Sequence, residues 1–224
     1  MGLKKLIKIL KEKRIPKFYY PQNWNIKESD KFLILSPHPD DDTIACGGLL
    51  AMYPKQCDII CLTDGRYGDP DIEPSKMVEI RKNEFETVMK QTGVNSYTWL
   101  GIEDSHLIEH GEIFKTINFK GYDYILMPSP FDTHPDHLAV DYLFKKYFKK
   151  HLDKVVYYEI WSTLNMPTNY IDITSVMDKK LENIRLYKSQ MKYIDYSSRI
   201  EGLNRYRGII PHVDYAEMYQ KARY

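Results

Sequence analysis

The sequence predicts an α/β fold with a mostly parallel sheet covered by helices on both faces. Short runs typical of buried strands alternate with helical segments along the chain, as in strand–helix–strand units. The chain has 224 residues, of which 43% are hydrophobic and 28% charged, so it can bury a sizeable core and is not of a disordered type. It contains no internal repeat and no low-complexity segment. We therefore expect one globular domain.

Five strands and four helices are expected in order along the chain. The first strand contains the apolar run Phe-Leu-Ile-Leu and the fourth contains Tyr-Ile-Leu-Met. The expected strands are at 32–36, 57–62, 96–100, 122–127 and 154–160, and the expected helices at 43–52, 76–92, 136–150 and 175–190. The stretch 64–71 is rich in Asp and Gly and directly follows a strand, which predicts a loop over the carboxyl edge of the sheet.

Residues 1–30 differ from the rest of the chain and form a predicted extension to a domain at 31–224. Apolar residues recur there at helical spacing, while lysines and arginines fill the other face, so a basic amphipathic helix is expected at 3–14. Its apolar positions are Leu3, Leu6, Ile7 and Leu10. Such a face suits docking on the domain, docking on a second copy in an oligomer, or peripheral contact with an anionic membrane surface.

Charge and cysteine usage limit the class of protein. The formal net charge is +1, and the sequence shows no motif for nucleic acid, so a nucleic-acid partner is not expected. The three cysteines, Cys46, Cys57 and Cys61, do not form a disulfide framework, and no run is apolar enough to span a bilayer. Cys57 and Cys61 lie four apart in a predicted strand and should pack on one face. A cytoplasmic location, with the inner membrane face as an alternative, is expected.

Two short polar clusters follow predicted strands. Residues 38–41 are His-Pro-Asp-Asp and residues 134–137 are His-Pro-Asp-His. The carboxyl ends of strands in an open α/β sheet converge on one crevice where ligands bind, so the two clusters can meet although about a hundred positions separate them. Aspartates and threonines are also good helix N-caps, so either cluster alone is equally compatible with a helix start.

Together the clusters predict a divided metal site. His38, Asp41 and His137 form a set of two imidazoles and one carboxylate, which suits Zn²⁺ with an open position and also suits Fe²⁺. Asp40 is placed beside the ion to take a proton from water. His134 is placed to stabilise an oxyanion, with Asp136 holding its ring and favouring the imidazolium.

At these residues the chain resembles the PIG-L/LmbE family of metal-dependent N-deacetylases. The resemblance runs from about residue 31 to residue 219 and includes several landmarks in the expected order. These landmarks are 62–65 (Leu-Thr-Asp-Gly), 81–84 (Arg-Lys-Asn-Glu), 100–104 (Leu-Gly-Ile-Glu-Asp), 170–174 (Tyr-Ile-Asp-Ile-Thr), 187–190 (Tyr-Lys-Ser-Gln), 205–208 (Arg-Tyr-Arg-Gly) and 215–217 (Tyr-Ala-Glu).

The resemblance implies a Rossmann-like fold and zinc-assisted hydrolysis of an N-acetyl group, usually on N-acetylglucosamine within a larger conjugate. It assigns metal binding to His38, Asp41 and His137, the base and acid role to Asp40, and oxyanion stabilisation to His134. Separately, Arg81 and Asp104 match positions that contact sugar hydroxyls in relatives. Arg81 is also compatible with a surface ion pair and Asp104 with a turn.

Two positions depart from the family pattern. Asp42 stands where Glu is usual, and Arg66 stands where the loop often carries Glu. A guanidinium at the crevice rim would favour an anionic group on the substrate. The leading hypothesis is an N-acetylglucosamine deacetylase, acting in surface glycan biosynthesis. The alternatives are a deacylase of another N-acyl compound or of a thiol-cofactor precursor, and a non-catalytic glycan-binding protein.

Overall fold

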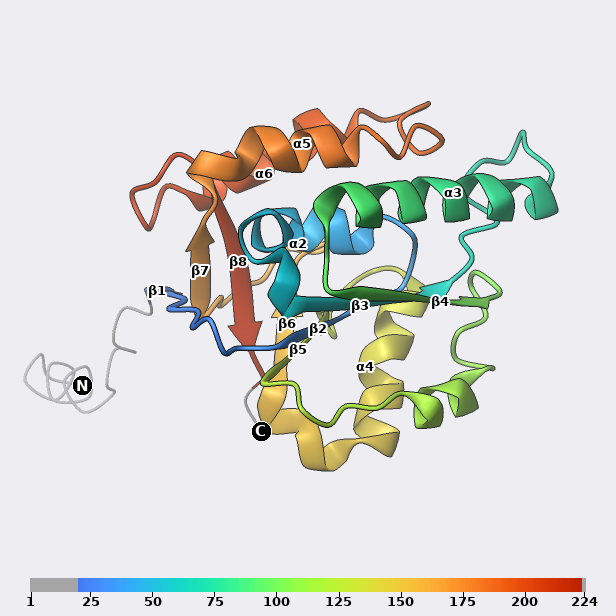
Figure 1. Cartoon of the computed structure of the whole chain (residues 1–224), viewed down its shortest axis with the longest axis horizontal. Coiled ribbons are helices and arrows are strands. Elements are labelled where there is room, and N and C mark those ends of the chain that lie inside the picture. The colour runs from blue at the N-terminus through green and yellow to red at the C-terminus, as the bar shows by residue number, and fades with distance from the viewer. Residues whose placement is uncertain (1–19, 223–224) are drawn as a thin grey trace, which may run out of the picture.

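The computed structural model describes residues 20–222, and the helix predicted at 3–14 lies outside them. Eight strands form one sheet in the order β1-β7-β8-β6-β5-β2-β3-β4 (Figure 1). Their bounds are β1 Gln22–Asn23, β2 Phe32–Ser36, β3 Cys57–Thr63, β4 Ser96–Ile102, β5 Tyr124–Pro128, β6 Val155–Tyr158, β7 Asn169–Asp172 and β8 Ala216–Lys221. The five predicted strands correspond to β2 to β6, which pair in parallel in the order β4-β3-β2-β5-β6. The prediction of a mostly parallel sheet is confirmed.

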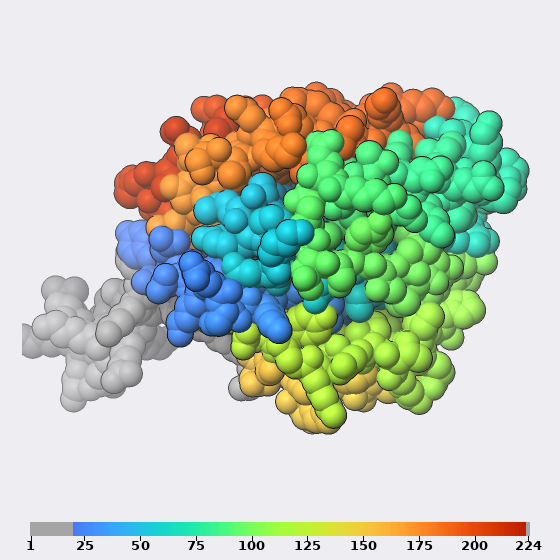
Figure 2. All heavy atoms as spheres, viewed as in Figure 1, coloured from blue at the N-terminus to red at the C-terminus, as the bar shows by residue number. Residues whose placement is uncertain are grey.

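Helices cover both faces of this sheet (Figure 1). The α-helices are α2 Asp41–Met52, α3 Pro74–Thr92, α4 Pro135–Tyr147, α5 Met177–Ile184 and α6 Tyr196–Arg207. Short 3-10 turns are η1 Pro54–Gln56, η2 Gly111–Thr116, η3 Lys149–Lys154 and η4 Thr174–Val176. One core contains side chains of α2, α3, α5 and α6, and the other contains side chains of α4, η2 and η3. In the space-filling view, α3 and the orange segment of α5 form a continuous upper layer (Figure 2).

Alternation along the central strands divides their side chains between the two cores. Phe32 and Ile34 of β2 pack into the core under α2, whereas Leu33 and Leu35 pack into the core over α4. Both faces of the strand are dry, which explains why its sequence is a continuous apolar run. Such runs are visible in a sequence without any knowledge of the fold.

The far end of the sheet was not predicted. β8 pairs antiparallel with both β6 and β7, and β1 pairs with β7. β7 has only four residues, and β8 has the sequence Ala-Glu-Met-Tyr-Gln-Lys, in which a glutamate is buried. The helix expected at 175–190 is also shorter, because α5 ends at Ile184 and turns follow it. α6 was missed because its sequence is polar, with few apolar residues at helical spacing.

The domain begins earlier than the predicted boundary at residue 31. Trp24 is only 6% exposed and makes edge-on ring contacts with Phe32, Tyr124 and Tyr219, at centroid distances of 5.0–5.7 Å. Gln22–Asn23 adds a strand to the sheet. The segment just before β2 is therefore part of the domain rather than of an extension, since an aromatic ring of this size buries a large apolar area.

A buried ion pair joins α5, α6 and β8 to α2. Nζ of Lys180 on α5 donates to Oε1 of Glu217 on β8 at 2.7 Å and to Oδ1 of Asn204 on α6 at 2.9 Å. The backbone N–H groups of Gly48 and Leu49 donate to the same carboxylate. Four elements therefore meet at one charged centre, which is closed to solvent.

Two adjacent glycines of α2 make this close packing possible. A Cβ on Gly47 would lie 2.7 Å from Cγ of Lys180, and a Cβ on Gly48 would lie 2.3 Å from Cγ2 of Ile173. The absence of a Cβ at these two positions therefore lets α2 approach Lys180 and Ile173 closely. The buried sulfur atoms lie in the same layer, with Cys57 and Cys61 in one core as expected. Within residues 20–222, no helix has the length and apolar character needed to cross a membrane.

Candidate active site

The two polar clusters meet at the point where the strand order reverses. In the sheet, β2 lies between β3 and β5. The chain leaves β2 and β5 in opposite directions, and a crevice opens at the carboxyl ends of these two strands. His38 and Asp41 follow β2, and His137 lies in the first turn of α4 after β5. Although 99 positions separate them, Nδ1 of His38 and Nε2 of His137 are 3.1 Å apart. The predicted convergence is therefore present in the structure.

Three donor atoms form a nearly equilateral triangle. Oδ2 of Asp41 lies 3.1 Å from Nδ1 of His38 and 3.1 Å from Nε2 of His137, which closes the triangle with the 3.1 Å separation of the two nitrogens. The backbone N–H of His38 donates to the same Asp41 oxygen at 2.8 Å and fixes the carboxylate. Donors around a small tetrahedral ion with bonds of about 2.0–2.1 Å lie about 3.3 Å apart. The three side chains therefore fit one divalent cation.

The charge around the triangle also suits a cation. Besides Asp41, four aspartates with at most 6% exposure lie around it, namely Asp40, Asp104, Asp132 and Asp136. The buried cationic partners in contact with them are Arg81 and the two histidines. Two other groups also lie close enough together to hold a metal, one of His38, His134 and His137 and one of His38, Asp104 and Asp136. All of them share His38.

The ring of His38 bridges the triangle to two further carboxylates. Its Nε2 lies 3.2 Å from Asp136 and 3.3 Å from Asp104. Burial lowers the pKa of His38, but hydrogen bonds to Asp104, Asp136 and Asp41 outweigh it and raise the pKa well above the usual value. Burial raises the pKa of Asp104, but the hydrogen bond to His38 outweighs this effect and holds the pKa at about 2. These carboxylates orient the ring so that Nδ1 faces the triangle.

The predicted contact between Asp136 and the ring of His134 is wrong. The Asp136 carboxylate accepts from the backbone N–H groups of Ser105 at 2.7 Å and Leu107 at 3.2 Å, and it faces His38. Asp136 contacts His134 through its backbone N–H, which donates to Nδ1 at 3.2 Å. The N-cap geometry of α4 explains this difference, because the capping side chain turns toward the helix and away from the Asp136 carboxylate.

This N-cap contact sets the hydrogen-bonding role of His134. Because Nδ1 accepts a hydrogen bond, the proton of the neutral ring is assigned to Nε2, which is then a donor. Burial and the neighbouring charges of His38 and His137 lower its pKa, which opposes the imidazolium expected from the sequence. Its ring stands edge-on to His38, with centroids 4.4 Å apart. The chain therefore presents a neutral donor beside the triangle.

Asp40 lies next to the triangle but is not part of it. Its Oδ2 pairs with Nη2 of Arg81 at 3.0 Å, and the same nitrogen donates to the carbonyl of Pro39 at 3.0 Å. Burial raises the pKa of Asp40 to about 6, although the charge of Arg81 opposes this shift. Arg81 is only 4% exposed, so it does not form the surface ion pair that the sequence allowed. Because its guanidinium is already paired with Asp40, it is also not a free cation for substrate. In this structure it positions Asp40.

Asp132 is a site residue that the sequence analysis missed. Its Oδ1 lies 3.1 Å from Nδ1 of His137 and accepts from the backbone N–H groups of Thr133 and His134. Its Oδ2 accepts from the backbone N–H of Trp161 at 3.1 Å. A carboxylate between a buried strand and the second cluster was the available signal. Burial lowers the pKa of His137, but the charge of Asp41 and the contact with Asp132 outweigh it and raise this pKa to about 9.

The active-site cavity lies above these residues and has a volume of about 150 Å³. Its lining residues are His38, Asp40, Asp41, Tyr67, Gly68, Arg81, Asp104, His134, Trp161, Gln190 and Tyr196. The predicted substrate contact Asp104 is among them. Arg66 is not, because its guanidinium is paired with Asp64 at 2.6 Å and with Glu103 at 3.1 Å. The structure therefore gives no support for the expectation that Arg66 recognises an anion.

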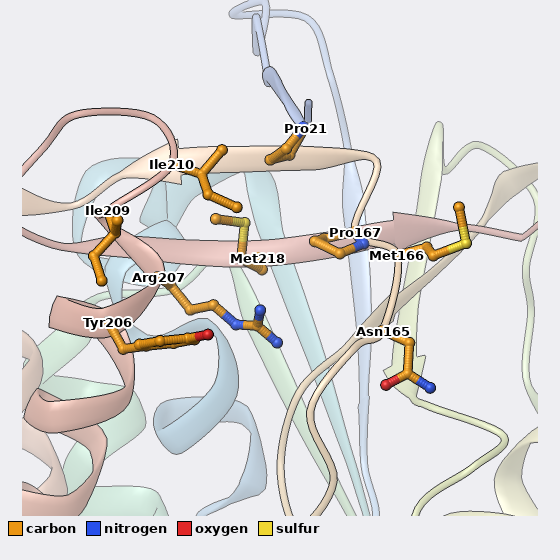
Figure 3. Close-up of a pocket in the computed structure, with 9 residues that line it drawn as sticks. All are labelled: Pro21, Asn165, Met166, Pro167, Tyr206, Arg207, Ile209, Ile210 and Met218. Atoms are coloured by element: carbon orange, nitrogen blue, oxygen red, sulfur yellow. The ribbon is translucent and has the colours of Figure 1, made fainter. Parts of the chain in front are cut away.

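A second cavity, of about 190 Å³, lies away from this chemistry and is mostly apolar. Figure 3 shows Tyr206 and Arg207 reaching toward it from α6, beneath Met218 of β8. Among its lining residues in the described chain, only Arg207 is charged, and its guanidinium is paired with Glu159. A hydrolytic role for this cavity has no support.

The fold and site define a class of protein: an α/β domain with a buried histidine–carboxylate site at the switch point of its sheet. The PIG-L family model, described as GlcNAc-PI de-N-acetylase, matches residues 33–148, which is more than half of the chain. The chain belongs to this family, as the sequence resemblance predicts.

Relatives with described activities are similar over most of the chain. The diacetylchitobiose deacetylase of Thermococcus kodakarensis is 26% identical over 213 residues, covering 79% of this chain and 76% of the relative. The structure of N,N'-diacetylchitobiose deacetylase from Pyrococcus horikoshii, in complex with its inhibitor MPG, superimposes with a TM-score of 0.72 and 22% identity, covering 98% of this chain and 92% of the other. The 4-carboxy-2-hydroxymuconate hydratase GalB from Pseudomonas putida superimposes with a TM-score of 0.65 and 18% identity, covering 87% and 97%. The fold alone therefore accommodates more than one reaction.

Proposed function

We propose that this protein is a metal-dependent hydrolase that removes the N-acetyl group from an N-acetylglucosamine-type sugar conjugate. The observation that carries the proposal is the triangle of His38, Asp41 and His137, with Asp40 beside it and His134 facing the same cavity. Membership of a de-N-acetylase family and the deacetylase relatives support the reaction class. Assembly of all five groups also argues against a purely glycan-binding protein.

The metal would be held by Nδ1 of His38, a carboxylate oxygen of Asp41 and Nε2 of His137. Two imidazoles and one carboxylate suit Zn²⁺, and Fe²⁺ is the alternative. When bound, such an ion polarises a carbonyl and makes water more acidic. Asp132 and Asp136 would support the two histidine ligands from behind, as outer carboxylates commonly do.

The side chains of the chain then account for the proton transfers and for charge stabilisation. Asp40 accepts a proton from the attacking water and returns it to the nitrogen of the leaving amine, so the C–N bond breaks to give a free amine and acetate. Nε2–H of His134 donates to the oxygen on which negative charge develops. The cavity of about 150 Å³ favours a short acetyl group over a longer acyl chain.

The location of the enzyme is inferred from its thiols. Cys46, Cys57 and Cys61 are all unpaired and buried, which is compatible with a reducing compartment. We therefore propose a cytoplasmic protein that acts on a small sugar substrate or glycan conjugate.

Metal analysis combined with acetate release tests the function directly. The purified full chain is expected to contain about one Zn²⁺ or Fe²⁺ per molecule and to release acetate from N,N'-diacetylchitobiose. Chelation should abolish turnover, and restoring the metal should recover it. His137→Ala should lose the ion, whereas the control His151→Ala, outside the site, should keep it. Full activity in the metal-free protein would reject the proposal.

Asp132→Asn tests the support behind His137. Removing the charge while keeping the shape should weaken metal affinity about 10- to 100-fold, because outer partners of ligating histidines have effects of this size. Competition with a coloured chelator measures the change. Asp141→Asn is a matched control, since Asp141 is a buried carboxylate on α4 that accepts from Tyr157 instead. Equal metal affinity in the two variants would contradict the role of Asp132.

A further inference from the structure

Two aromatic side chains from separate segments form one wall of the active-site cavity. Trp161 lies in the loop after β6, and Tyr196 is the first residue of α6. Their ring centroids are 5.5 Å apart, with 50° between the planes. Both rings line the cavity together with Asp40 and His134. The Trp161–Tyr196 wall therefore stands beside the groups to which we assign catalysis.

Trp161 is exposed, yet its loop is firmly anchored. The residue is 42% exposed, while its backbone N–H is held by the buried Asp132. The ends of the loop are joined because Glu159 accepts from the N–H of Leu164 at 2.6 Å. Arg207 pairs with Glu159 and donates to the carbonyl of Leu164 at 3.0 Å. These contacts fix the backbone of the loop, and the contact with Tyr196 positions the ring. A partly exposed aromatic ring on such a loop is pre-positioned for a ligand, which lowers the entropic cost of binding.

The size of the cavity requires that part of a substrate conjugate lies outside it. Pockets that enclose a drug-sized ligand measure about 300–1,000 Å³. The active-site cavity, at about 150 Å³, accommodates an acetamido group with part of its sugar ring. The remainder of the conjugate must cross the rim, where Tyr67 and Trp161 are both about half exposed, at 51% and 42%. The group attached to the reacting sugar therefore meets aromatic side chains first.

The charges at the cavity favour a neutral attached group. Arg81 is the lining arginine, and it is already paired with Asp40. Arg66 nearby is paired with two carboxylates. Several buried aspartates line the floor and would repel a phosphate. A pyranose ring suits the wall, because its C–H face packs on an aromatic ring while its hydroxyl groups remain in water.

We propose that the Trp161–Tyr196 wall binds a second, neutral pyranose ring that is linked to the N-acetylated sugar undergoing hydrolysis. The preferred substrate is then an oligosaccharide rather than a monosaccharide or an alkyl glycoside. This inference deepens the proposed function and rests on it for the identity of the reacting sugar.

Binding measurements on an Asp40→Asn background test the wall without turnover. Calorimetric titration compares N,N'-diacetylchitobiose, N-acetylglucosamine and octyl N-acetylglucosaminide. Trp161→Ala should weaken binding of the disaccharide about tenfold and leave the monosaccharide within about twofold, as loss of one aromatic contact predicts. Trp161→Phe should retain most of the affinity. Tyr142→Ala, which removes another exposed aromatic side chain on α4, is the control and should change none of the three.

Three other outcomes would reject the proposal that the Trp161–Tyr196 wall binds a second pyranose ring. Equal losses for monosaccharide and disaccharide would overturn it, because Trp161 would then act on the reacting sugar or on the fold. An equal dependence of the octyl glycoside on Trp161 would show a general apolar surface and would also overturn it. Absence of disaccharide binding to the parent protein would do the same.

Acetate release by the parent protein separates this proposal from the proposed function. Binding of the disaccharide that depends on Trp161, without acetate release, keeps the second-ring site and rejects the deacetylase. Acetate release with no effect of Trp161→Ala on disaccharide affinity keeps the deacetylase and rejects the second-ring site.

Discussion

Asp40→Asn is expected to lower kcat by about 10²- to 10⁴-fold while the metal remains bound. The amide keeps the shape of the side chain but cannot accept and return a proton, and general acid–base catalysis contributes about this much. The triangle of donors does not include Asp40, so metal content should equal that of the parent. Steady-state acetate release and metal analysis of the same preparation measure both quantities.

Asp42, two residues after Asp40, offers a matched control. Asp42 is also buried, and its carboxylate accepts from the hydroxyl groups of Ser36 and Thr43. Burial raises its pKa to about 7, so a neutral amide at this position resembles a form that is already populated. Asp42→Asn should therefore stay within a few-fold of the parent rate. A parent-like rate for Asp40→Asn would reject the assignment of the base.

Lys180→Met is expected to lower the free energy of unfolding by about 3–5 kcal/mol. The change leaves Glu217 charged and buried without its cationic partner, and breaking a buried pair from one side has this cost. Urea unfolding followed by circular dichroism measures it. Adding Glu217→Gln should recover a substantial part of the loss, because the unpaired charge is then removed.

The adjacent lysine separates burial from charge. Lys179 is 44% exposed along its side chain and pairs with Glu182 at 3.4 Å. Lys179→Met should change the free energy of unfolding by less than about 1 kcal/mol, as exposed ion pairs contribute little. Equal effects of the two substitutions would show that the buried pair has no special part in stability.

The central half of the fold was predictable because its strands are buried on both faces. The run from Phe32 to Leu35 is uniformly apolar for that reason, and the same holds for β5. β8 gave no such signal, because its Glu217 is stabilised by Lys180, which comes from a helix 37 positions earlier. Pairing of buried charges depends on tertiary contacts, so sequence periodicity cannot show it.

The candidate site was predictable to a similar degree. Convergence of His38 with His137 follows from two strands ending at one edge, which the sequence implies. The partner of a carboxylate does not follow, because it depends on local rotation of side chains. Asp136 faces His38 instead of His134, and Arg66 is neutralised by Asp64 and Glu103. The meeting of His38, Asp41 and His137 was predicted from the sequence, whereas their outer contacts required coordinates.

The position of β8 has a consequence for how this sheet assembles. β7 and β1 reach the other strands only through β8, which is inserted between β6 and β7 and pairs antiparallel with both. Before β8 docks, β6 presents an open edge with unpaired backbone groups, and such edges invite pairing with other chains. Docking closes a loop of about sixty residues between β6 and β8, a long-range step of the kind that slows folding. Aggregation during refolding should therefore be governed by the time for which the β6 edge stays uncovered.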